Sequence, residues 1–313
     1  MRWLHVSDFH VGKDEYATRK MFSYILEHVK SKKVAGFSPD FLFITGDIAN
    51  KGADKEYEIF WLEFVTPLQE IIGGDIKRLT FAVPGNHDVD RRENPAFSRD
   101  EMVGPKSQYF DSTPNGGKLR KIFEPRFAAY QQADLTACGV QIFGEKGAFF
   151  TGFDVRGIKV GIVGINTAWL TKGDDDEGRL TPGKTLLENA LDAVKNEQIK
   201  FVLGHHPIDW FFKHEQKMLK SLLGLHGSIY LHGHLHDAWA EPTYGGGNMY
   251  LAIQAGSCFQ AREGERWKNG LLWGEADVST SEIKLQPMNW IADHQSWAIV
   301  SDAFPDNMKT GDW

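Results

Sequence analysis

The sequence predicts an α/β fold with a largely parallel sheet. Three apolar runs, at residues 3–6, 41–45 and 79–83, have the length of buried strands. Two longer segments, at residues 19–32 and 54–72, separate these runs and repeat apolar residues at the spacing of amphipathic helices. Strands that alternate with helices in this way are typical of βαβ units, in which neighbouring strands run parallel.

Local signals mark the ends of these first elements. In the second helix, Asp54 is a candidate N-cap, because an Asp side chain accepts hydrogen bonds from the free N–H groups of the first turn. Gly73 and Gly74 then end that helix. The third strand stops at Pro84, which cannot continue a ladder of backbone hydrogen bonds.

Residues 89 to about 148 break the alternation of strands and helices. The segment is rich in Pro, Gly, Asn and charged residues, with one helix expected over residues 118–133 and interrupted or restarted at Pro125. Long irregular loops in compact domains are usually functional or disordered. We interpret this segment as an insertion that lies over the active face, not as a separate domain.

The second half of the chain contains further strand-like runs. Residues 149–155 and 159–166 alternate like an antiparallel hairpin that turns at Arg156-Gly157. A helix over residues 185–196 and strands at 201–203 and 228–231 follow. Three later runs indicate a second sheet with antiparallel edges, and they lie at residues 249–253, 270–273 and 282–285. The acidic run at residues 174–177 favours a solvated loop, because adjacent carboxylates repel one another.

Composition limits the class of protein. A chain of 313 residues with 42% hydrophobic content suffices for one large domain or two modest ones. We expect a single domain over residues 1–300 and an irregular tail over residues 301–313. The net charge of -7 provides no global basic field for nucleic acid, although two bound divalent ions would reverse the sign of an acidic cleft locally.

Cysteine content and apolar runs bear on the compartment. Only Cys138 and Cys258 are present, far apart, which argues against a disulfide scaffold or a thiolate zinc site and fits a reducing compartment. The first residues already read as a strand that leads to a candidate ligand, Asp8, so no signal peptide is expected. No apolar run approaches the length of about 20 residues that a membrane span needs. We expect a cytoplasmic protein without a membrane partner.

Polar clusters follow five of the predicted strands. Their imidazole, carboxylate and amide groups, without thiolate, suit divalent metals such as Mn²⁺, Fe²⁺, Zn²⁺ or Ni²⁺. Asp8 and His10 are two residues apart, as are His234 and His236, so in an extended backbone each pair points to one side. The candidate ligands are Asp8, His10, Asp47, Asn86, His205, His234 and His236. These are too many for one tetrahedral ion and suit two ions that share a carboxylate.

The order of these clusters resembles the calcineurin-like metallophosphoesterase family. The shared motifs are Asp8-x-His10, Gly46-Asp47, Gly85-Asn86-His87-Asp88, Val202-x-x-His205 and Gly233-His234-x-His236. The resemblance spans residues 8–236. It implies a two-sheet αββα sandwich with the metal site at the carboxyl ends of the strands.

The resemblance also implies a role for each motif residue. One ion would be held by Asp8, His10 and His236, and a second by Asn86, His205 and His234, with Asp47 bridging both. In the family, a hydroxide that bridges the metals attacks phosphorus in line. His87 would stabilise the transition state or protonate the leaving oxygen, and Asp88 would orient and charge-pair with His87. The residues themselves leave His205 and His206 as alternatives for one ligand, and we favour His205 on the Val-x-x-His spacing.

The expected activity is that of a metal-dependent phosphoric ester hydrolase. Similarity of the Gly-Asn-His-Asp and Gly-His-Leu-His blocks to the family's cyclic-nucleotide phosphodiesterases and nucleases favours a phosphodiester of nucleotide type. A phosphomonoesterase, or a nuclease that uses the insertion as a nucleic acid platform, is the alternative within the family. An effector or binding module, part of a longer protein or docked on a partner through residues 301–313, is the alternative outside it.

Overall fold

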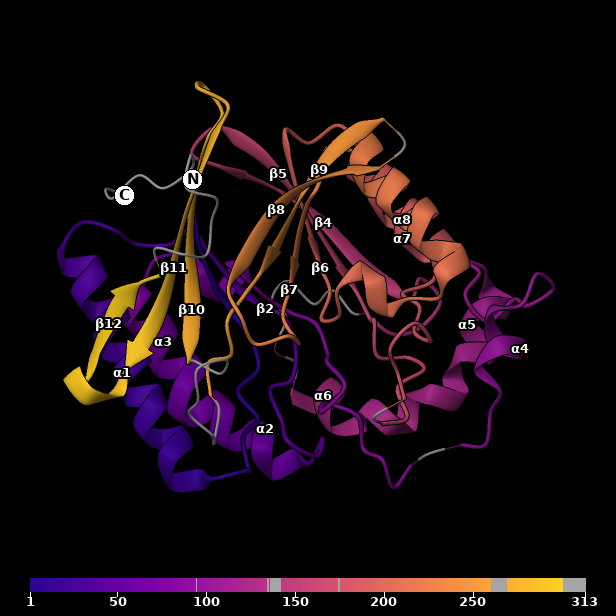
Figure 1. Cartoon of the computed structure of the whole chain (residues 1–313), viewed down its shortest axis with the longest axis horizontal. Coiled ribbons are helices and arrows are strands. Elements are labelled where there is room, and N and C mark those ends of the chain that lie inside the picture. Colours follow the sequence, from indigo (N-terminus) through magenta and orange to yellow (C-terminus); the bar gives the residue numbers. More distant parts are fainter. Residues whose placement is uncertain are drawn as a thin grey trace.

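Two six-stranded sheets stack face to face and carry helices on their outer sides (Figure 1). The computed structural model describes residues 1–300 except 94, 134, 136–141, 174, 246 and 260–268. Helices α1 and α3 lie beside the first sheet, and α7 and α8 beside the second (Figure 1). The two-sheet α/β architecture predicted from the sequence is therefore confirmed.

The first sheet has the strand order β12-β11-β10-β1-β2-β3. Its parallel part consists of β1 (Arg2–Val6), β2 (Phe41–Ile44) and β3 (Thr80–Ala82). Its antiparallel part consists of β10 (Gly270–Asp277), β11 (Glu282–Ile291) and β12 (Ser296–Ile299). Strand β1 thus pairs with β2, from early in the chain, on one side and with β10, from late in the chain, on the other.

The connections of the first sheet follow the predicted helices, with two differences. Helix α1 (Glu15–Val34) joins β1 to β2. The single helix expected before β3 is divided into three elements: α2 (Asp54–Phe60), a π-helical turn (Trp61–Val65) and α3 (Thr66–Ile72). A 3-10 turn (Ile76–Leu79) follows them. The expected N-cap at Asp54 is wrong, because Asp54 is already helical. Instead the Glu56 carboxylate accepts the backbone N–H of Ala53 at 3.0 Å.

The second sheet has the order β4-β5-β6-β7-β9-β8. Its strands are β4 (Ala148–Val155), β5 (Ile158–Ile165), β6 (Ile199–Leu203), β7 (Ile229–His232), β8 (Trp239–Gly245) and β9 (Asn248–Gln254). Strands β4 and β5 form the expected hairpin, in which Arg156 and Gly157 both have positive φ. Helix α7 (Lys184–Ala193) was expected, whereas α8 (Lys213–Leu225) was not.

The strands after residue 245 do not form a sheet of their own, so that prediction is wrong. Strand β9 pairs parallel with β7 of the second sheet, whereas β10 pairs antiparallel with β1 of the first. Each local apolar run was recognisable as a strand, but its partner is distant in sequence. Pairing of this kind depends on packing between elements, which local patterns do not encode.

The segment at residues 89–148 forms short helices. They are α4 (Arg99–Val103), α5 (Pro114–Arg120), a 3-10 helix (Lys121–Phe127) that contains Pro125, and α6 (Ala128–Ala133). The buried guanidinium of Arg126 donates to the carbonyl oxygen of Trp169 at 2.9 Å, which ties the segment to the loop after β5. Its description as an insertion over the active face stays a prediction. The expected tail at residues 301–313 lies outside the described residues.

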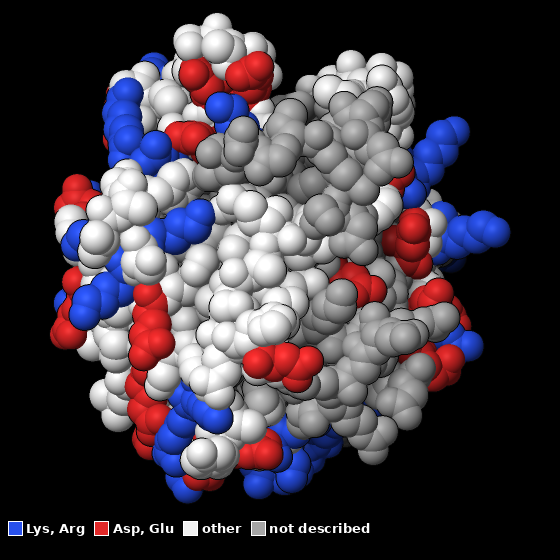
Figure 2. Space-filling model, turned by 60° about the vertical axis from the view of Figure 1, so that its left-hand side comes forward, with Lys and Arg blue, Asp and Glu red and all other residues white. Residues whose placement is uncertain are grey.

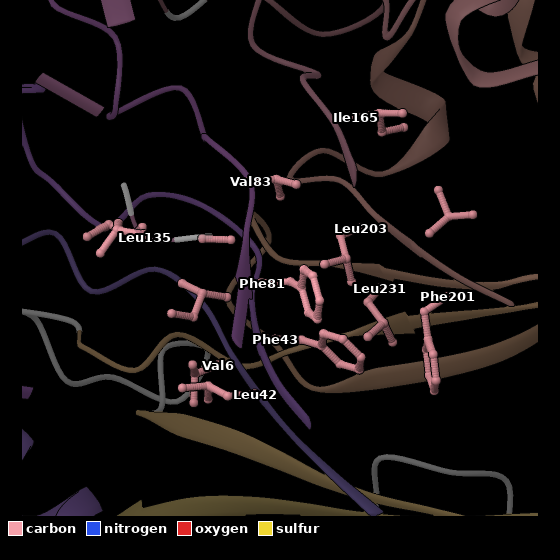
Figure 3. Packing of buried hydrophobic residues seen from close by; sticks show 14 of the residues in the cluster. Val6, Leu42, Phe43, Phe81, Val83, Leu135, Ile165, Phe201, Leu203 and Leu231 are labelled. Carbon is pink, nitrogen blue, oxygen red and sulfur yellow. The ribbon is translucent and has the colours of Figure 1, made fainter. Parts of the chain in front are cut away.

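The core lies between the two sheets. Phe43 and Phe81 of the first sheet face Phe201, Leu203 and Leu231 of the second (Figure 3). The rings of Phe43 and Phe201 have centroids 4.9 Å apart, and both residues are fully buried. Burial of such rings contributes roughly 25 cal/mol for each Å² of apolar surface removed from water, so this contact fixes how one sheet sits on the other.

Among the residues that the structure describes, none of the helices combines the length and the apolar content that a membrane crossing requires.

The acidic run after β5 is not the wholly solvated loop that was expected. Asp176 is buried and pairs with the buried guanidinium of Arg99, whereas its neighbour Asp175 is exposed and pairs with Arg179 at 2.5 Å. Arg99 also donates to the carbonyl oxygen of Leu170 at 3.0 Å. This buried ion pair therefore joins α4 to the loop after β5.

Replacement of Asp176 by Asn should destabilise the protein strongly. The change leaves the Arg99 charge buried without its counter-ion, which costs about 3 kcal/mol of unfolding free energy. The matched control Asp175→Asn removes an exposed pair and should cost less than about 1 kcal/mol. Urea unfolding of the two variants measures the difference, and equal stability of both would contradict this account of the ion pair.

Candidate metal centre

The loops after five strands bring the seven predicted ligands together at the carboxyl-terminal edge of both sheets. The Nε2 atom of His236 lies 3.1 Å from Oδ1 of Asp8. The Nε2 atom of His205 lies 3.3 Å from Oδ2 of Asp47 and 3.1 Å from Oδ1 of Asn86. Residues that are far apart in sequence thus meet within hydrogen-bond distance.

The donor atoms fall into overlapping groups that lie on two sides of the centre. Asp8, His10 and His236 have ligand atoms within 4.8 Å of one another. His205 and His234 belong to another such group, and Nδ1 of His234 lies 3.0 Å from the Asn86 amide oxygen. Asp47 appears with His10 in one group and with Asp8 and His205 in another, so its carboxylate lies between the two sides.

Five of the seven candidate ligands have left-handed backbone conformations. The φ angles are 58° at Asp8, 45° at His10, 51° at Asp47, 74° at His234 and 66° at His236. Such conformations are uncommon for residues other than glycine, and they cluster at functional sites. The extended backbone expected for the two Asp-x-His and His-x-His pairs is therefore wrong. The side chains converge because the chain turns sharply at each ligand.

Hydrogen bonds from a distant segment hold Asp8 in its unusual conformation. Its backbone oxygen accepts from the hydroxyl of Ser257 at 2.9 Å and from the N–H of Phe259 at 3.1 Å. Its own N–H donates to the carbonyl oxygen of Gly46 at 3.0 Å. The segment after β9 was not among the predicted site residues, because a serine that supports a loop through its backbone carries no local signal.

Two glycines allow the loops to approach one another. A Cβ atom at Gly85 would lie 2.2 Å from Oδ1 of Asp47. A Cβ atom at Gly233 would lie 2.0 Å from the hydroxyl of Ser7 and 2.4 Å from Oδ2 of Asp8. Any side chain at these positions would push candidate ligands apart, so the glycines of both motifs serve close contact between loops.

The ring nitrogens and amide oxygen fit a bound cation. Nδ1 of His205 donates to the carbonyl oxygen of Thr45 at 2.7 Å, which directs Nε2 toward the other donors. That Nε2 atom lies 3.3 Å from Nδ1 of His234, and both lie near the Asn86 oxygen. The buried Nδ1 atom of His10 has no hydrogen-bond partner among the described residues. Lone pairs that converge without enough protons to pair them fit a divalent ion bound by nitrogen and oxygen.

Electrostatics favour the charge states that bind metal. Burial raises the pKa of Asp8 and Asp47, but the neighbouring His236 and His205 outweigh it and lower both below the usual range. Burial lowers the pKa of His10 to about 4 and of His234 to about 3. For His205, burial lowers the pKa, yet the Asp47 and Asp8 carboxylates raise it to about 9 overall. Ionised carboxylates and neutral imidazoles are the forms that coordinate cations, and His205 would release its proton on binding.

His87 lies beside the first group of donors. Its ring is edge-on to that of His10, with centroids 4.6 Å apart, and its backbone N–H donates to Oδ1 of Asp47 at 2.8 Å. Nδ1 of the ring donates to the carbonyl oxygen of Asn50 at 3.0 Å. Since Nδ1 is engaged, Nε2 is the ring nitrogen left for chemistry, and the side chain is only half-buried.

The expected pairing of Asp88 with His87 is wrong. Oδ1 of Asp88 accepts the hydroxyl of Tyr57 at 2.8 Å and the N–H of Ala49 at 2.9 Å. Oδ2 accepts the N–H of Gly85 at 2.8 Å. Asp88 therefore joins the loops after β2 and β3 to helix α2, and the Asn50 carbonyl orients His87 instead. A buried carboxylate next to N–H donors satisfies several backbone groups at once. This explains why the Asp88 side chain points into the protein and not toward His87.

His206 belongs to the same group of donor atoms as His205 and His234. Its Nδ1 is 2.8 Å from the hydroxyl of Thr167, which also accepts the backbone N–H groups of His205 and His206 at 3.2 Å. The centroid of its ring is 4.6 Å from that of the His234 ring. His205 faces Asp47 and Asn86 directly, which favours it as the ligand, and the choice between the two histidines stays a prediction.

Known proteins share the motifs and the architecture of this chain. A protein-family model described as calcineurin-like phosphoesterase matches residues 1–238, which include all five motif clusters. The uncharacterized metallophosphoesterase-like protein YydB of Bacillus subtilis (strain 168) is 24% identical over 326 residues. The match covers 95% of this chain and 61% of that protein, so the chain spans less than two thirds of the relative's length.

Solved structures with similar folds include PhoD, with a TM-score of 0.52 at 10% identity. The match covers 98% of this chain and 72% of the PhoD chain. A hypothetical protein from Thermus thermophilus has a TM-score of 0.47 at 15% identity, with 93% and 99% covered. At such low identity the similarity to PhoD bears on the fold alone, and it agrees with the two-sheet architecture.

Replacement of Asp88 by Asn should weaken both the fold and the centre. The amide keeps one acceptor oxygen but turns an NH₂ group toward N–H or O–H donors, which costs about 1–3 kcal/mol of unfolding free energy. The affinity for added Mn²⁺, used as a probe of the centre, should also fall, because Gly85 adjoins Asn86. Urea unfolding and metal analysis test both effects, with Asp90→Asn as control, since Asp90 pairs with the exposed Arg92 at 2.8 Å. Unchanged stability combined with an altered pH dependence of turnover would instead favour a pairing of Asp88 with His87.

Proposed function

Since the chain belongs to the calcineurin-like phosphoesterase family, we propose that it hydrolyses phosphodiesters of nucleotide type with two divalent metal ions. The observation that supports the proposal is the convergence of two groups of nitrogen and oxygen donors around the Asp47 carboxylate. Two ions about 3.5–4 Å apart are suited to clamp the attacking and leaving oxygens of a phosphoryl displacement. Mn²⁺, Fe²⁺, Zn²⁺ and Ni²⁺ all accept this donor set.

We assign the ligands by the two groups. Asp8, His10 and His236 would hold one ion, Asn86, His205 and His234 the other, and Asp47 both. When bound, such ions neutralise charge on the phosphate and lower the pKa of water to near neutrality. The supporting contacts of Thr45, Gly46 and Ser257 fix the donors in advance, so that little reorganisation is needed when substrate arrives.

His87 is proposed as the general acid. In the displacement, the oxygen of a water that has lost one proton to solvent bonds to phosphorus, and the bond from phosphorus to the leaving oxygen breaks. The leaving oxygen then needs a proton, which Nε2 of His87 can supply if the imidazole is protonated. The Asn50 carbonyl keeps the ring in one orientation through Nδ1. A positioned acid of this kind typically contributes about 10²–10⁴-fold to the rate.

Surface charge supports a small substrate over duplex nucleic acid. Among the described residues on the face shown in Figure 2, acidic and basic side chains are intermixed. The net charge of the chain is -7. Duplex binding depends on several phosphate contacts from Lys and Arg, which a continuous basic area would provide. A nucleotide-type diester needs only the metal centre and its immediate surroundings.

The expected substrate preference is testable with chromogenic esters. In Mn²⁺, the protein should hydrolyse bis-p-nitrophenyl phosphate with a higher kcat/KM than p-nitrophenyl phosphate, and excess chelator should abolish both activities. The chelated protein should recover when Mn²⁺ is restored. A preference for the monoester would make the protein a phosphomonoesterase. Two bound ions without turnover of either ester would favour a binding module instead.

Loss of His87 should depend on the leaving group. With a 3′,5′-cyclic nucleotide, whose leaving oxygen is a basic alkoxide, His87→Ala should lower kcat by about 10²-fold or more. With bis-p-nitrophenyl phosphate the loss should be much smaller, because p-nitrophenolate leaves without a proton. Metal content should stay unchanged, and the exposed His214 provides the control His214→Ala. An equal loss on both substrates would argue against proton donation by His87.

A further inference from the structure

One tryptophan lies directly beside the candidate metal centre. The indole ring of Trp210 has its centroid 4.0 Å from that of His234, at an interplanar angle of 79°. It also lies nearly parallel to the ring of His206, at 28° and a centroid distance of 5.8 Å. Both histidines belong to the group of donors around His205. Trp210 therefore forms an aromatic wall on one side of the centre.

The backbone of Trp210 is fixed by two loops. Trp210 ends a 3-10 turn (Ile208–Trp210) that follows the Gly-His-His-Pro sequence after β6. Its N–H donates to the carbonyl oxygen of Pro207 at 3.0 Å, and its own carbonyl oxygen accepts the N–H of Leu180 at 3.2 Å. Leu180 belongs to the loop after β5. These bonds fix the backbone from which the indole extends, and the ring itself contacts His234 and His206.

Unlike the tryptophans of the core, Trp210 is only partly buried. Trp3, Trp169 and Trp273 are fully buried, whereas Trp210 is partly exposed to solvent. An aromatic ring held at the edge of a polar site offers a flat apolar face for a ligand. Planar groups such as nucleobases stack on such rings whichever base is present, because every base has a π-face.

Trp210 and His87 contact different groups of donors. His87 belongs with His10 and Asp47, whereas Trp210 touches His234 and His206 of the other group. Asp47 connects the two groups through its proximity to His205. A phosphate centred near Asp47 would therefore present one substituent toward His87 and another toward Trp210.

We infer that Trp210 binds the substituent that stays on phosphorus during hydrolysis, by stacking on its planar aromatic group. This inference rests on the proposed function, in which His87 protonates the departing oxygen. The substrate class is then a phosphodiester whose retained substituent is a nucleoside or an aryl group. When a phosphomonoester is hydrolysed, no such substituent stays on phosphorus, so Trp210 favours turnover of diesters and also binds the monoester product that keeps the nucleoside.

Three diesters with one common leaving group test this role. Thymidine 5′-(p-nitrophenyl phosphate) and bis-p-nitrophenyl phosphate retain an aromatic substituent, whereas methyl p-nitrophenyl phosphate retains a methyl group. Trp210→Ala should lower kcat/KM about fivefold or more for the first two, the ratio expected when at least about 1 kcal/mol of stacking is lost. The methyl ester should change less than about twofold, and Trp210→Phe should keep most of the activity.

A binding measurement separates this inference from the proposed function. Calorimetry in Mn²⁺ should show that Trp210→Ala weakens thymidine 5′-monophosphate about fivefold and leaves methyl phosphate unchanged. The control Trp290→Ala removes a partly buried tryptophan that stacks on Tyr24, in the first sheet, and should change neither ligand. This arm needs no turnover, so it tests Trp210 even if the protein hydrolyses none of the esters.

The outcomes are distinct. Absence of turnover in the unaltered protein, with the expected loss of thymidine 5′-monophosphate binding in Trp210→Ala, overturns the proposed hydrolysis but not the stacking role. An equal loss for all three diesters and for both ligands overturns the stacking role, because it indicates a general disturbance of the centre. No change in any measurement overturns it as well.

Discussion

The hydrogen bond from His205 to the carbonyl oxygen of Thr45, 2.7 Å long, is the contact on which the centre depends. It connects the end of β6 in the second sheet to the end of β2 in the first. The same junction contains the bond from the backbone N–H of His234 to Asp8, at 3.1 Å. Each proposed ligand group therefore contains members from both sheets. Farther inside the core, the tilted rings of Phe43 and Phe201 also join the two sheets, with centroids 4.9 Å apart.

This arrangement strains the backbone. Left-handed backbone conformations at Asp8, Asp47 and His234 cost free energy, and they persist only because surrounding contacts stabilise them. Support comes from Asp88, from the Ser257 segment and from glycines that let the loops touch. The side chains of Asp88 and Ser257 are themselves buried. The contacts around the centre thus explain why residues of no evident chemistry are required for it.

The sequence allowed the fold and most of the centre to be predicted for a clear physical reason. Buried strands such as those before Asp8 and Asp47 are continuous apolar runs, and the polar residues after them stand out against that background. Helix α8 escaped notice because only one narrow side of it is buried, at Leu219, Leu223 and Gly224.

Contacts made through the backbone could not be predicted at all. The role of Asn50 depends on its carbonyl oxygen, which every residue possesses. The placement of β10 beside β1, and of Trp210 beside His234, depends on which segments meet in space. The identity of a residue does not carry that information. The motif around Asp88 was recognised from its residues. The direction of the Asp88 carboxylate was not predicted, because it depends on the N–H and hydroxyl groups that surround it in the fold.

The distribution of ligands along the chain has a consequence for synthesis. Asp8 and His10 are translated long before their proposed partner His236. Asn86 is likewise translated well before its proposed partners His205 and His234. On the ribosome, neither group of donors is complete until the loop after β7 has been translated, which follows three strands of the first sheet and four of the second. A partly made chain therefore offers only isolated carboxylates and imidazoles, and tight capture of ions is deferred until the two halves have packed together.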